Sequence, residues 1–354
     1  MLAAMRRPML GHLDPAFHEV LDEVTALLRA VWQMPDGDVL ALPATGTSAM
    51  EAGLANLLEP GDTAIVAQAG YFGRRIGDIA ERHGANVVRV TAPWGETVPN
   101  AAILDALDRH PATRLVAVVH AETSTGTLHP LRELGTELFG YDVLLMADCV
   151  TSLGGVPLDV GRWGVDYAFS CTQKCLAAPP GMAPVAISQR AWRRIRERST
   201  PVPFSLDLEL LRRYWAERPA VYHHTAPILG IYALHEALRR VLDEGLEVRW
   251  ARHAAAGVSL QASLRASGLE LLADPRRQLA PLTAVRVPDG IDGKAVQARL
   301  LAEHGIEIGG GLGPDAPPMW RIGLMGRNAT VATATKVLCA LDAVLADVPQ
   351  PIAA

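Results

Sequence analysis

The chain has 354 residues, of which 49% are hydrophobic and 20% are charged. This composition is typical of a globular protein with large buried cores, and the length predicts two domains. The formal net charge is −5, and the Lys and Arg residues are scattered singly or in short groups. Because this pattern offers no basic stripe for a phosphate backbone, we expect no nucleic-acid partner.

The N-terminus and the cysteines bear on location. The first ten residues lack the continuous apolar segment of a secretory signal, because Arg6, Arg7 and Pro8 interrupt them. No stretch approaches the roughly 20 apolar residues of a membrane span, so we expect no membrane association. The four cysteines lack the paired spacing of a zinc site, and we expect no bound metal. Reduced thiols fit best, which favours a cytoplasmic protein.

Seven short, β-rich apolar runs recur along the first half of the chain, with amphipathic segments between most of them. This rhythm predicts an α/β, doubly wound fold whose mostly parallel sheet is covered by helices. The expected strands are Val39–Leu42, Ala64–Ala67, Val87–Val90, Leu115–Val119, Val143–Ala147, Tyr167–Ser170 and Met182–Ile187. The expected helices are Ala16–Trp32, Ser48–Leu57, Arg74–His83, Ala101–Arg109 and Pro130–Phe139.

The pattern changes after Ala226, where a long helical stretch continues to about Ala266. A smaller mixture of strands and helices follows, which predicts a second α+β domain. Its expected elements are strands at Leu269–Leu272, Leu282–Val287 and Trp320–Leu324 and a helix near Lys294–His304. We therefore expect an N-terminal segment (1–15), a large domain (16–250) and a small C-terminal domain (251–354).

Thr45, Gly46 and Thr47 follow a predicted strand and open a predicted helix. The free N–H groups and the positive end of a helix can bind a phosphate at such a turn. The same residues also fit an ordinary helix N-cap, which is the better interpretation of this segment by itself.

Asp148 stands at the carboxyl end of a predicted buried strand, where ligands bind in open α/β sheets. Its carboxylate could neutralise a protonated ring nitrogen of a pyridine cofactor, and such a ring is an electron sink for carbanion chemistry. The competing interpretation is an aspartate that caps the following loop.

Lys174 lies in an apolar loop that Pro179, Pro180 and Gly181 close. Lysine is rarely placed in such surroundings without a partner, and an apolar site favours the neutral amine that reacts with an aldehyde. A surface lysine that extends its amine into water is the less favoured alternative.

The lysine loop carries a resemblance to a known family. Ser170–Leu176 followed by Ala178–Gly181 resembles the lysine signature of the alanine–glyoxylate and serine–glyoxylate aminotransferases, which are class V pyridoxal-phosphate enzymes. Further segments agree in order and spacing, so the resemblance extends from Gly11–Pro15 to the last helix. These segments are Thr45–Ala52, His120–Gly126, Asp148–Gly155, Tyr222–Pro227 and Arg321–Gly326.

The resemblance implies the fold-type I architecture and a pyridoxal 5′-phosphate site. Lys174 is implied as the lysine that binds the cofactor covalently and acts as the base, with Asp148 paired to the ring nitrogen. The other implied cofactor contacts are Thr45, Gly46, Thr47 and Gln173 at the phosphate and Phe72 and Val150 on the two ring faces. Thr123 or Ser124 would bind the ring hydroxyl or frame the substrate. Tyr71 is an alternative to Phe72 as the stacking residue.

Three further residues have implied roles outside this set. Tyr222 and Thr225 would reach across a homodimer interface and complete the phosphate site of the neighbouring subunit. Arg321 would bind the α-carboxylate of the substrate, because its planar guanidinium suits a bidentate grip. A structural salt bridge is the default interpretation of a single arginine, but the resemblance favours substrate binding.

The activity implied is ping-pong transamination from a small amino acid, serine or alanine, to a 2-oxo acid such as glyoxylate or pyruvate. Two alternatives stay open on the same fold: a sister transaminase, such as one acting on ureidoglycine, and a lyase similar to cysteine desulfurases. The lyase would need a mobile nucleophilic cysteine, for which no cysteine of this sequence is well placed. Members of the resembled group usually have a Gly- and Pro-rich arm before the first helix, so we expect residues 1–15 to be a shortened arm.

Overall fold

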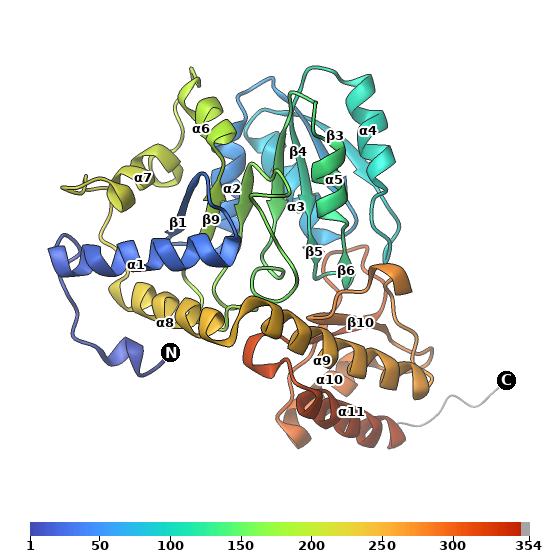
Figure 1. Cartoon of the computed structure of the whole chain (residues 1–354). Coiled ribbons are helices and arrows are strands. Elements are labelled where there is room, and N and C mark those ends of the chain that lie inside the picture. The colour runs from blue at the N-terminus through green and yellow to red at the C-terminus, as the bar shows by residue number, and fades with distance from the viewer. Residues whose placement is uncertain (348–354) are drawn as a thin grey trace.

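A seven-stranded sheet forms the centre of the larger part of the computed structural model, which describes residues 1–347 (Figure 1). The strand order is β1-β9-β8-β7-β4-β2-β3. Only β9 runs antiparallel to its neighbours β1 and β8, and the other pairs are parallel. This confirms the predicted, mostly parallel seven-stranded sheet. The strands are β1 (Asp38–Leu42), β2 (Thr63–Gln68), β3 (Asn86–Thr91), β4 (Thr113–Val119), β7 (Leu144–Asp148), β8 (Tyr167–Phe169) and β9 (Ala183–Ile187).

Helices pack on both faces of this sheet, and the five predicted between strands are present with ends shifted by up to three residues (Figure 1). They are α1 (Pro15–Trp32), α2 (Gly46–Leu57), α3 (Tyr71–Arg82), α4 (Asn100–Arg109) and α5 (Leu131–Glu137). Next come α6 (Gln189–Arg196), α7 (Leu208–Ala216) and the 3₁₀ turn η2 (Phe204–Leu206). A short hairpin, β5 (Ala121–Glu122) and β6 (Thr127–Leu128), follows β4.

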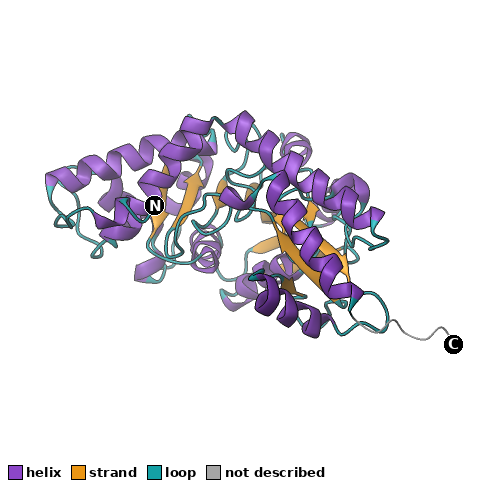
Figure 2. Cartoon of the chain, turned by 90° about the horizontal axis from the view of Figure 1, so that it is seen from below, coloured by secondary structure: helices purple, strands orange, loops and turns teal. Residues whose placement is uncertain are grey.

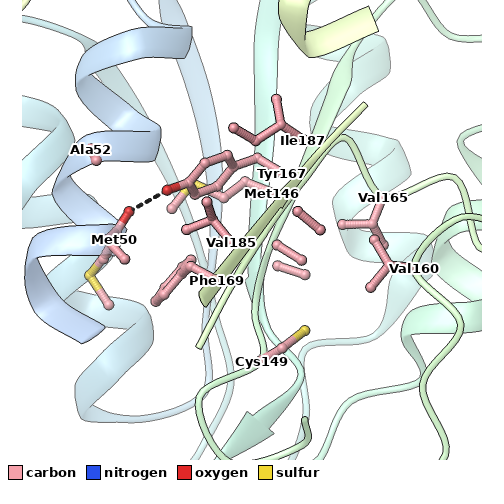
Figure 3. Packing of buried hydrophobic residues seen from close by; sticks show 14 of the residues in the cluster. Met50, Ala52, Met146, Cys149, Val160, Val165, Tyr167, Phe169, Val185 and Ile187 are labelled. Atoms are coloured by element: carbon pink, nitrogen blue, oxygen red, sulfur yellow. Dashed lines mark hydrogen bonds between the residues drawn. The ribbon is translucent and has the colours of Figure 1, made fainter. Parts of the chain in front are cut away.

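Tyr167 fixes α2 against the sheet. Its hydroxyl donates to the carbonyl oxygen of Ala49 at 2.7 Å, and Met146, Phe169 and other buried side chains surround the ring (Figure 3). Helix α2 has a glycine, Gly53, over this ring, because a Cβ there would lie 2.4 Å from the ring carbon Cε1. The contact positions the start of α2, which is the predicted phosphate-binding turn.

The predicted helical stretch from Ala226 to Ala266 is two helices, α8 (Ile228–Glu244) and α9 (Leu246–Ala266). Gly245 separates them with a φ of +84°, a left-handed conformation that glycine adopts at little cost. The prediction of one continuous stretch was therefore wrong at this residue. Apolar residues resume directly after the break, so the hydrophobic pattern does not reveal it.

A second sheet, in the order β10-β12-β11, forms the C-terminal part together with two helices (Figure 2). Its elements are β10 (Leu282–Arg286), β11 (Gly309–Gly310), β12 (Met319–Gly323), α10 (Gly293–His304), α11 (Val331–Ala346) and the turns η3 (Pro275–Arg277) and η4 (Gly326–Asn328). The strand expected at Leu269–Leu272 is reduced to one isolated bridge, from Leu271 to Val285.

Separate hydrophobic cores occupy the two parts of the molecule. The buried residues of the larger core lie between positions 17 and 241, and those of the second lie between positions 256 and 344. This separation supports the domain boundary near residue 250, which stays a proposal. The last seven residues of the proposed small domain, 348–354, lie outside the described residues.

The N-terminal segment crosses the surface of two helices before α1 begins. It contains the 3₁₀ turn η1 (Ala4–Arg6). Tyr214 and Tyr232 donate hydrogen bonds from their hydroxyls to the carbonyl oxygens of His12 (2.9 Å) and Pro8 (3.2 Å). Among residues 1–347, no helix combines the length and the apolar character needed to cross a membrane.

Candidate active site

The carboxyl ends of the parallel strands surround a cavity of about 210 Å³. Ligands bind at this edge in open α/β sheets, because loops diverge there. Nine of the twelve predicted site residues line the cavity: Thr45, Gly46, Thr47, Phe72, Thr123, Asp148, Val150, Gln173 and Lys174. The structure therefore brings together residues from five separate stretches of the chain.

The first turn of α2 forms one wall of this cavity. Thr45 is the N-cap, and its hydroxyl oxygen accepts from the N–H of Ser48 at 3.1 Å. The N–H groups of Gly46 and Thr47 have no acceptor in the part of the chain that the structure describes. A Cβ at Gly46 would lie 3.2 Å from Val150, so a larger residue would fill the space in front of these donors. The turn thus serves as a cap and keeps two donors free for an anion.

Asp148 ends β7 with a side chain that is only 3% exposed. Its Oδ1 accepts from the N–H of Val150 at 2.9 Å, and Oδ2 has no partner within residues 1–347. The pKa of Asp148 is raised to about 7, mainly because the carboxyl group is buried, and the nearby carboxylate of Glu122 adds to this rise. The hydrogen bond from Val150 and the positive charge of Lys174 both act to lower the pKa. A carboxylate with one free buried oxygen is suited to a cationic ligand atom.

Lys174 is half-buried in the loop after β8, and its amine has no hydrogen-bond or ion-pair partner among the described residues. The loop itself is firmly held. The hydroxyl of Thr172 contacts the carbonyl oxygens of Pro179 and Met182, and Ala177 adopts a φ of +58° that is rare outside glycine. A rigid loop with a free amine is what covalent chemistry at this residue needs.

The structure separates the two aromatic candidates. Phe72 lines the cavity, whereas Tyr71 does not and instead accepts a hydrogen bond from Arg75 at its hydroxyl (2.9 Å). Both aromatics stand at the start of α3, where Glu122 holds the backbone. Its Oε2 accepts from the N–H groups of Phe72 (3.1 Å) and Gly73 (3.2 Å).

Glu122 is a site residue that the sequence reasoning missed. Its Oε1 accepts from the N–H of Ser124 (3.0 Å) and from the hydroxyl of the same residue (2.7 Å). The carboxylate is buried, and burial raises its pKa while these donors oppose the rise. Glu122 thus connects the start of α3, which carries Phe72, to the turn that carries Thr123. Glu122 lies in the segment His120–Gly126, which resembles the family. An acidic residue in a short turn is usually exposed, so the sequence did not indicate that Glu122 is buried.

Arg321 lies on β12 beside the cavity. Its Nε donates to the carbonyl oxygen of Gly310 (2.6 Å) and its Nη1 to that of Thr123 (3.1 Å). No carboxylate lies within ion-pair distance among residues 1–347, so the structural salt bridge weighed as an alternative is not formed by the described residues. The carbonyl contacts orient the guanidinium and leave Nη2 for an anionic ligand.

Two side chains of helix α9 hold the backbone of segments around the site. Arg249 is buried, and it donates to the carbonyl oxygens of Gly154 (3.0 Å) and of Cys175 in the lysine loop. His253, one turn further, accepts from the N–H of Gly326 at 3.0 Å, just after β12. Nothing in the sequence indicated these roles, because arginines on a charged helix are normally solvated.

Tyr222 and Thr225 do not line the cavity, and both are exposed; 59% of the Tyr222 surface is accessible. The structure of the single chain therefore leaves these two predicted residues away from the other ten.

The cysteines near the site are unsuited to nucleophilic chemistry. Cys149, Cys171 and Cys175 are buried, and burial raises the pKa of both Cys171 and Cys175 to about 12. Their thiols therefore stay protonated near neutral pH. Cys339 is exposed, but it lies on α11 rather than on a loop near Lys174.

Solved structures share this architecture over nearly the full length. The alanine–glyoxylate aminotransferase of Nostoc sp. is 47% identical with a TM-score of 0.94, and the match covers 97% of this chain and 91% of that one. The ureidoglycine–glyoxylate aminotransferase of Bacillus subtilis is 38% identical with a TM-score of 0.95, and the match covers 100% and 91%. The fold is therefore that of the fold-type I aminotransferases, as the resemblance implied.

The family follows from the sequence matches. The model of the family described as aminotransferase class-V matches residues 2–330. The alanine–glyoxylate aminotransferase of Callithrix jacchus is 38% identical over 353 residues, which covers 99% of this chain and 85% of the relative. The chain belongs to the class-V aminotransferase family, and the protein is an aminotransferase.

Proposed function

We propose that this aminotransferase uses pyridoxal 5′-phosphate to move an amino group from serine or alanine to a 2-oxo acid such as glyoxylate or pyruvate. The observation that carries the proposal is the meeting in one cavity of a lysine amine and a buried aspartate oxygen, neither of which has a partner among residues 1–347. The relatives named for alanine–glyoxylate and ureidoglycine–glyoxylate activity support glyoxylate as the acceptor.

The residues present fit this cofactor. The free N–H groups at the start of α2, with Thr45 and Gln173, would hold the phosphate. The free Oδ2 of Asp148 would pair with the ring nitrogen, and Phe72 and Val150 would cover the two faces of the ring. When bound, the cofactor supplies an electron sink for the substrate α-carbon.

The chain's own groups would then perform three tasks. Arg321 would bind the substrate α-carboxylate through its free Nη2, since its other nitrogens are oriented by backbone carbonyls. The Nζ of Lys174 would take the proton from the substrate α-carbon as a base and afterwards return it as an acid. The buried environment of Asp148 would exclude water from its carboxylate.

A small donor is favoured by the relatives named for alanine–glyoxylate activity. Within residues 1–347, Lys174 is the only cationic residue that lines the cavity, and Arg321 beside it is assigned to the α-carboxylate, so no lining arginine is left for the second carboxylate of aspartate or glutamate. A ureidoglycine donor is the second candidate, favoured by the match to the Bacillus subtilis enzyme. The high pKa values of Cys171 and Cys175 speak against a desulfurase.

We also propose a homodimer in which Tyr222 and Thr225 complete the partner's phosphate site. Their exposure in the single chain supports this, as do exposed apolar residues in the N-terminal segment and at residue 204: Leu2, Met9, Leu13 and Phe204. Mixing inactive Lys174→Ala with a Tyr222→Ala/Thr225→Ala variant should restore activity, because one of the two sites in a mixed dimer is intact. Absence of recovery in a mixed dimer demonstrated by mass would contradict the shared site.

The four free cysteines support a cytoplasmic location.

Lys174→Ala tests the cofactor assignment. The wild-type protein loaded with pyridoxal phosphate should absorb visible light, and borohydride should fix the cofactor on the peptide that contains Lys174. The variant should lose both signals, whereas Lys294→Ala, which changes an exposed lysine on α10, should keep them. Fixation on another lysine would refute the assignment.

Single-turnover reactions test the substrates. Serine, alanine, glutamate and ureidoglycine are added singly to the loaded enzyme, and the loss of visible absorbance is followed. We expect serine or alanine to react fastest and glyoxylate or pyruvate to restore the spectrum. Release of sulfide from cysteine as the fastest reaction would instead indicate a lyase.

A further inference from the structure

Arg75 is a cation beside the phosphate-binding turn that the proposed site does not use. It lies in the second turn of α3, half-buried, and its Nη1 donates to the hydroxyl oxygen of Thr47 at 3.1 Å. The guanidinium also lies over the rings of Tyr71 and Phe72, 4.8 and 5.2 Å from their centres. No carboxylate pairs with it in the described part of the chain, whereas its neighbour Arg74 pairs with Asp315.

The proposed cofactor phosphate needs more positive charge than the cavity lining supplies. A phosphate monoester carries about −1.5 to −2 charges near neutral pH. The end of a helix offers the equivalent of roughly +0.5 charge. Lys174 is the only cationic residue in the lining within residues 1–347, and its nitrogen is committed to the covalent link. A further cation close to the turn is therefore expected.

The hydrogen bond to Thr47 gives Arg75 a route to that phosphate. Because the guanidinium donates to the hydroxyl oxygen, the hydroxyl proton of Thr47 is free to point to another acceptor. A donor polarised by a neighbouring cation is a stronger donor. Thr47 also lines the cavity, and its backbone N–H has no acceptor among residues 1–347.

We propose that Arg75 is the counter-charge for the cofactor phosphate and acts on it through the hydroxyl of Thr47. The inference rests on the proposed use of pyridoxal phosphate. The charge of Arg75, which no carboxylate pairs in the described part of the chain, is held between Phe72 and Thr47 and is thereby fixed in place. Arg75 is a positioning residue, since no contact of its own with the cavity interior is seen.

Two ligands that differ only in the phosphate separate this role from a purely structural one. Dissociation constants of the cofactor-free protein are measured for pyridoxal phosphate and for pyridoxal. Arg75→Gln should weaken binding of pyridoxal phosphate about 10- to 100-fold, the usual range for a hydrogen bond with a charged partner. Pyridoxal binding should change less than about twofold, and inorganic phosphate should compete less well with pyridoxal phosphate in the variant.

Matched variants complete the experiment. Arg74→Gln removes an adjacent arginine that pairs with Asp315, and both ligands should bind it as they bind the wild type. Arg75→Lys keeps the charge and should fall between Arg75→Gln and the wild type, which provides a result even if Arg75→Gln fails to fold. In a Thr47→Val background, the loss caused by Arg75→Gln should become smaller, because the route through the hydroxyl is gone.

Three results would overturn the inference. Equal weakening of both ligands by Arg75→Gln would indicate a role in ring packing alone. Unchanged binding would show that the phosphate does not sense this charge. Intact cofactor binding with a selective loss of turnover for glutamate or aspartate would assign Arg75 to a substrate carboxylate. If the wild-type protein itself bound no pyridoxal phosphate, the proposed function would fail instead.

Discussion

The buried carboxylate of Asp148 should make the cofactor-free protein less stable as the pH rises, and Asp148→Asn should remove this effect. Burial raises the pKa of Asp148 from 3.8 to about 7. Because the folded-state pKa lies above the unfolded-state value, the folded state is favoured at low pH and loses stability as the pH rises from about 4 to about 7. At about 1.4 kcal/mol per pKa unit, full ionisation costs about 4 kcal/mol.

Urea unfolding of the two cofactor-free proteins, at equal concentration between pH 4 and pH 8, measures this cost. The free energy of unfolding of Asp148→Asn minus that of the wild type should increase by about 4 kcal/mol across this range. Other titrating groups are common to both proteins and cancel in the difference. With cofactor bound, the increase should shrink, because a cationic ring nitrogen compensates the carboxylate.

A constant difference across this pH range would refute the reasoning. It would mean that Asp148 ionises in the folded protein as easily as in the unfolded chain. The same variant should lose most of its transaminase activity, because an amide cannot neutralise the ring nitrogen.

Arg321→Lys should raise KM for the amino donor at least about tenfold with a smaller change in kcat, because an ammonium cannot reproduce the planar fork; steady-state kinetics check this, and an unchanged KM would exclude carboxylate binding. Gly46→Ala should weaken cofactor binding about tenfold or more by placing a methyl 3.2 Å from Val150, whereas Gly11→Ala, whose methyl would lie an ordinary 3.8 Å from Asp14, should not. Tyr167→Phe should lower the free energy of unfolding by about 1 kcal/mol through loss of the 2.7 Å hydrogen bond to Ala49; chemical denaturation would show no loss if this bond contributed nothing.

The sheet could be predicted because most of its strands are buried on both faces, although the edge strand β3 is not. Such strands appear as continuous apolar runs, for example Leu115–Val119, in which every residue is buried. The helix break at Gly245 could not be predicted, since a single glycine inside a long amphipathic pattern is usually tolerated. The direction of α9 after the break depends on contacts with the second core rather than on local sequence.

The candidate site could be predicted where motifs sit at strand ends, as Asp148 and Lys174 do. The choice between Tyr71 and Phe72 could not be predicted. Neighbouring residues of a helix point in different directions, and the exact start of α3 decides which ring faces the cavity. Glu122 was missed for a related reason. Its burial depends on donors from Phe72 and Gly73, some 50 positions earlier in the chain, and no local pattern reports such a contact.

The contacts of α9 have a consequence for engineering substrate preference. Arg249 anchors the lysine loop and His253 anchors the backbone after β12, so the loop that carries the reactive amine is held by contacts outside the cavity lining. Exchanges in the turns that carry Phe72 and Thr123, with these two residues themselves kept, can therefore alter donor preference without displacing the amine. Mutant libraries should therefore vary these turns and leave α9 unchanged. Even conservative substitutions in α9 would shift the lysine loop, and this would lower the activity with every substrate.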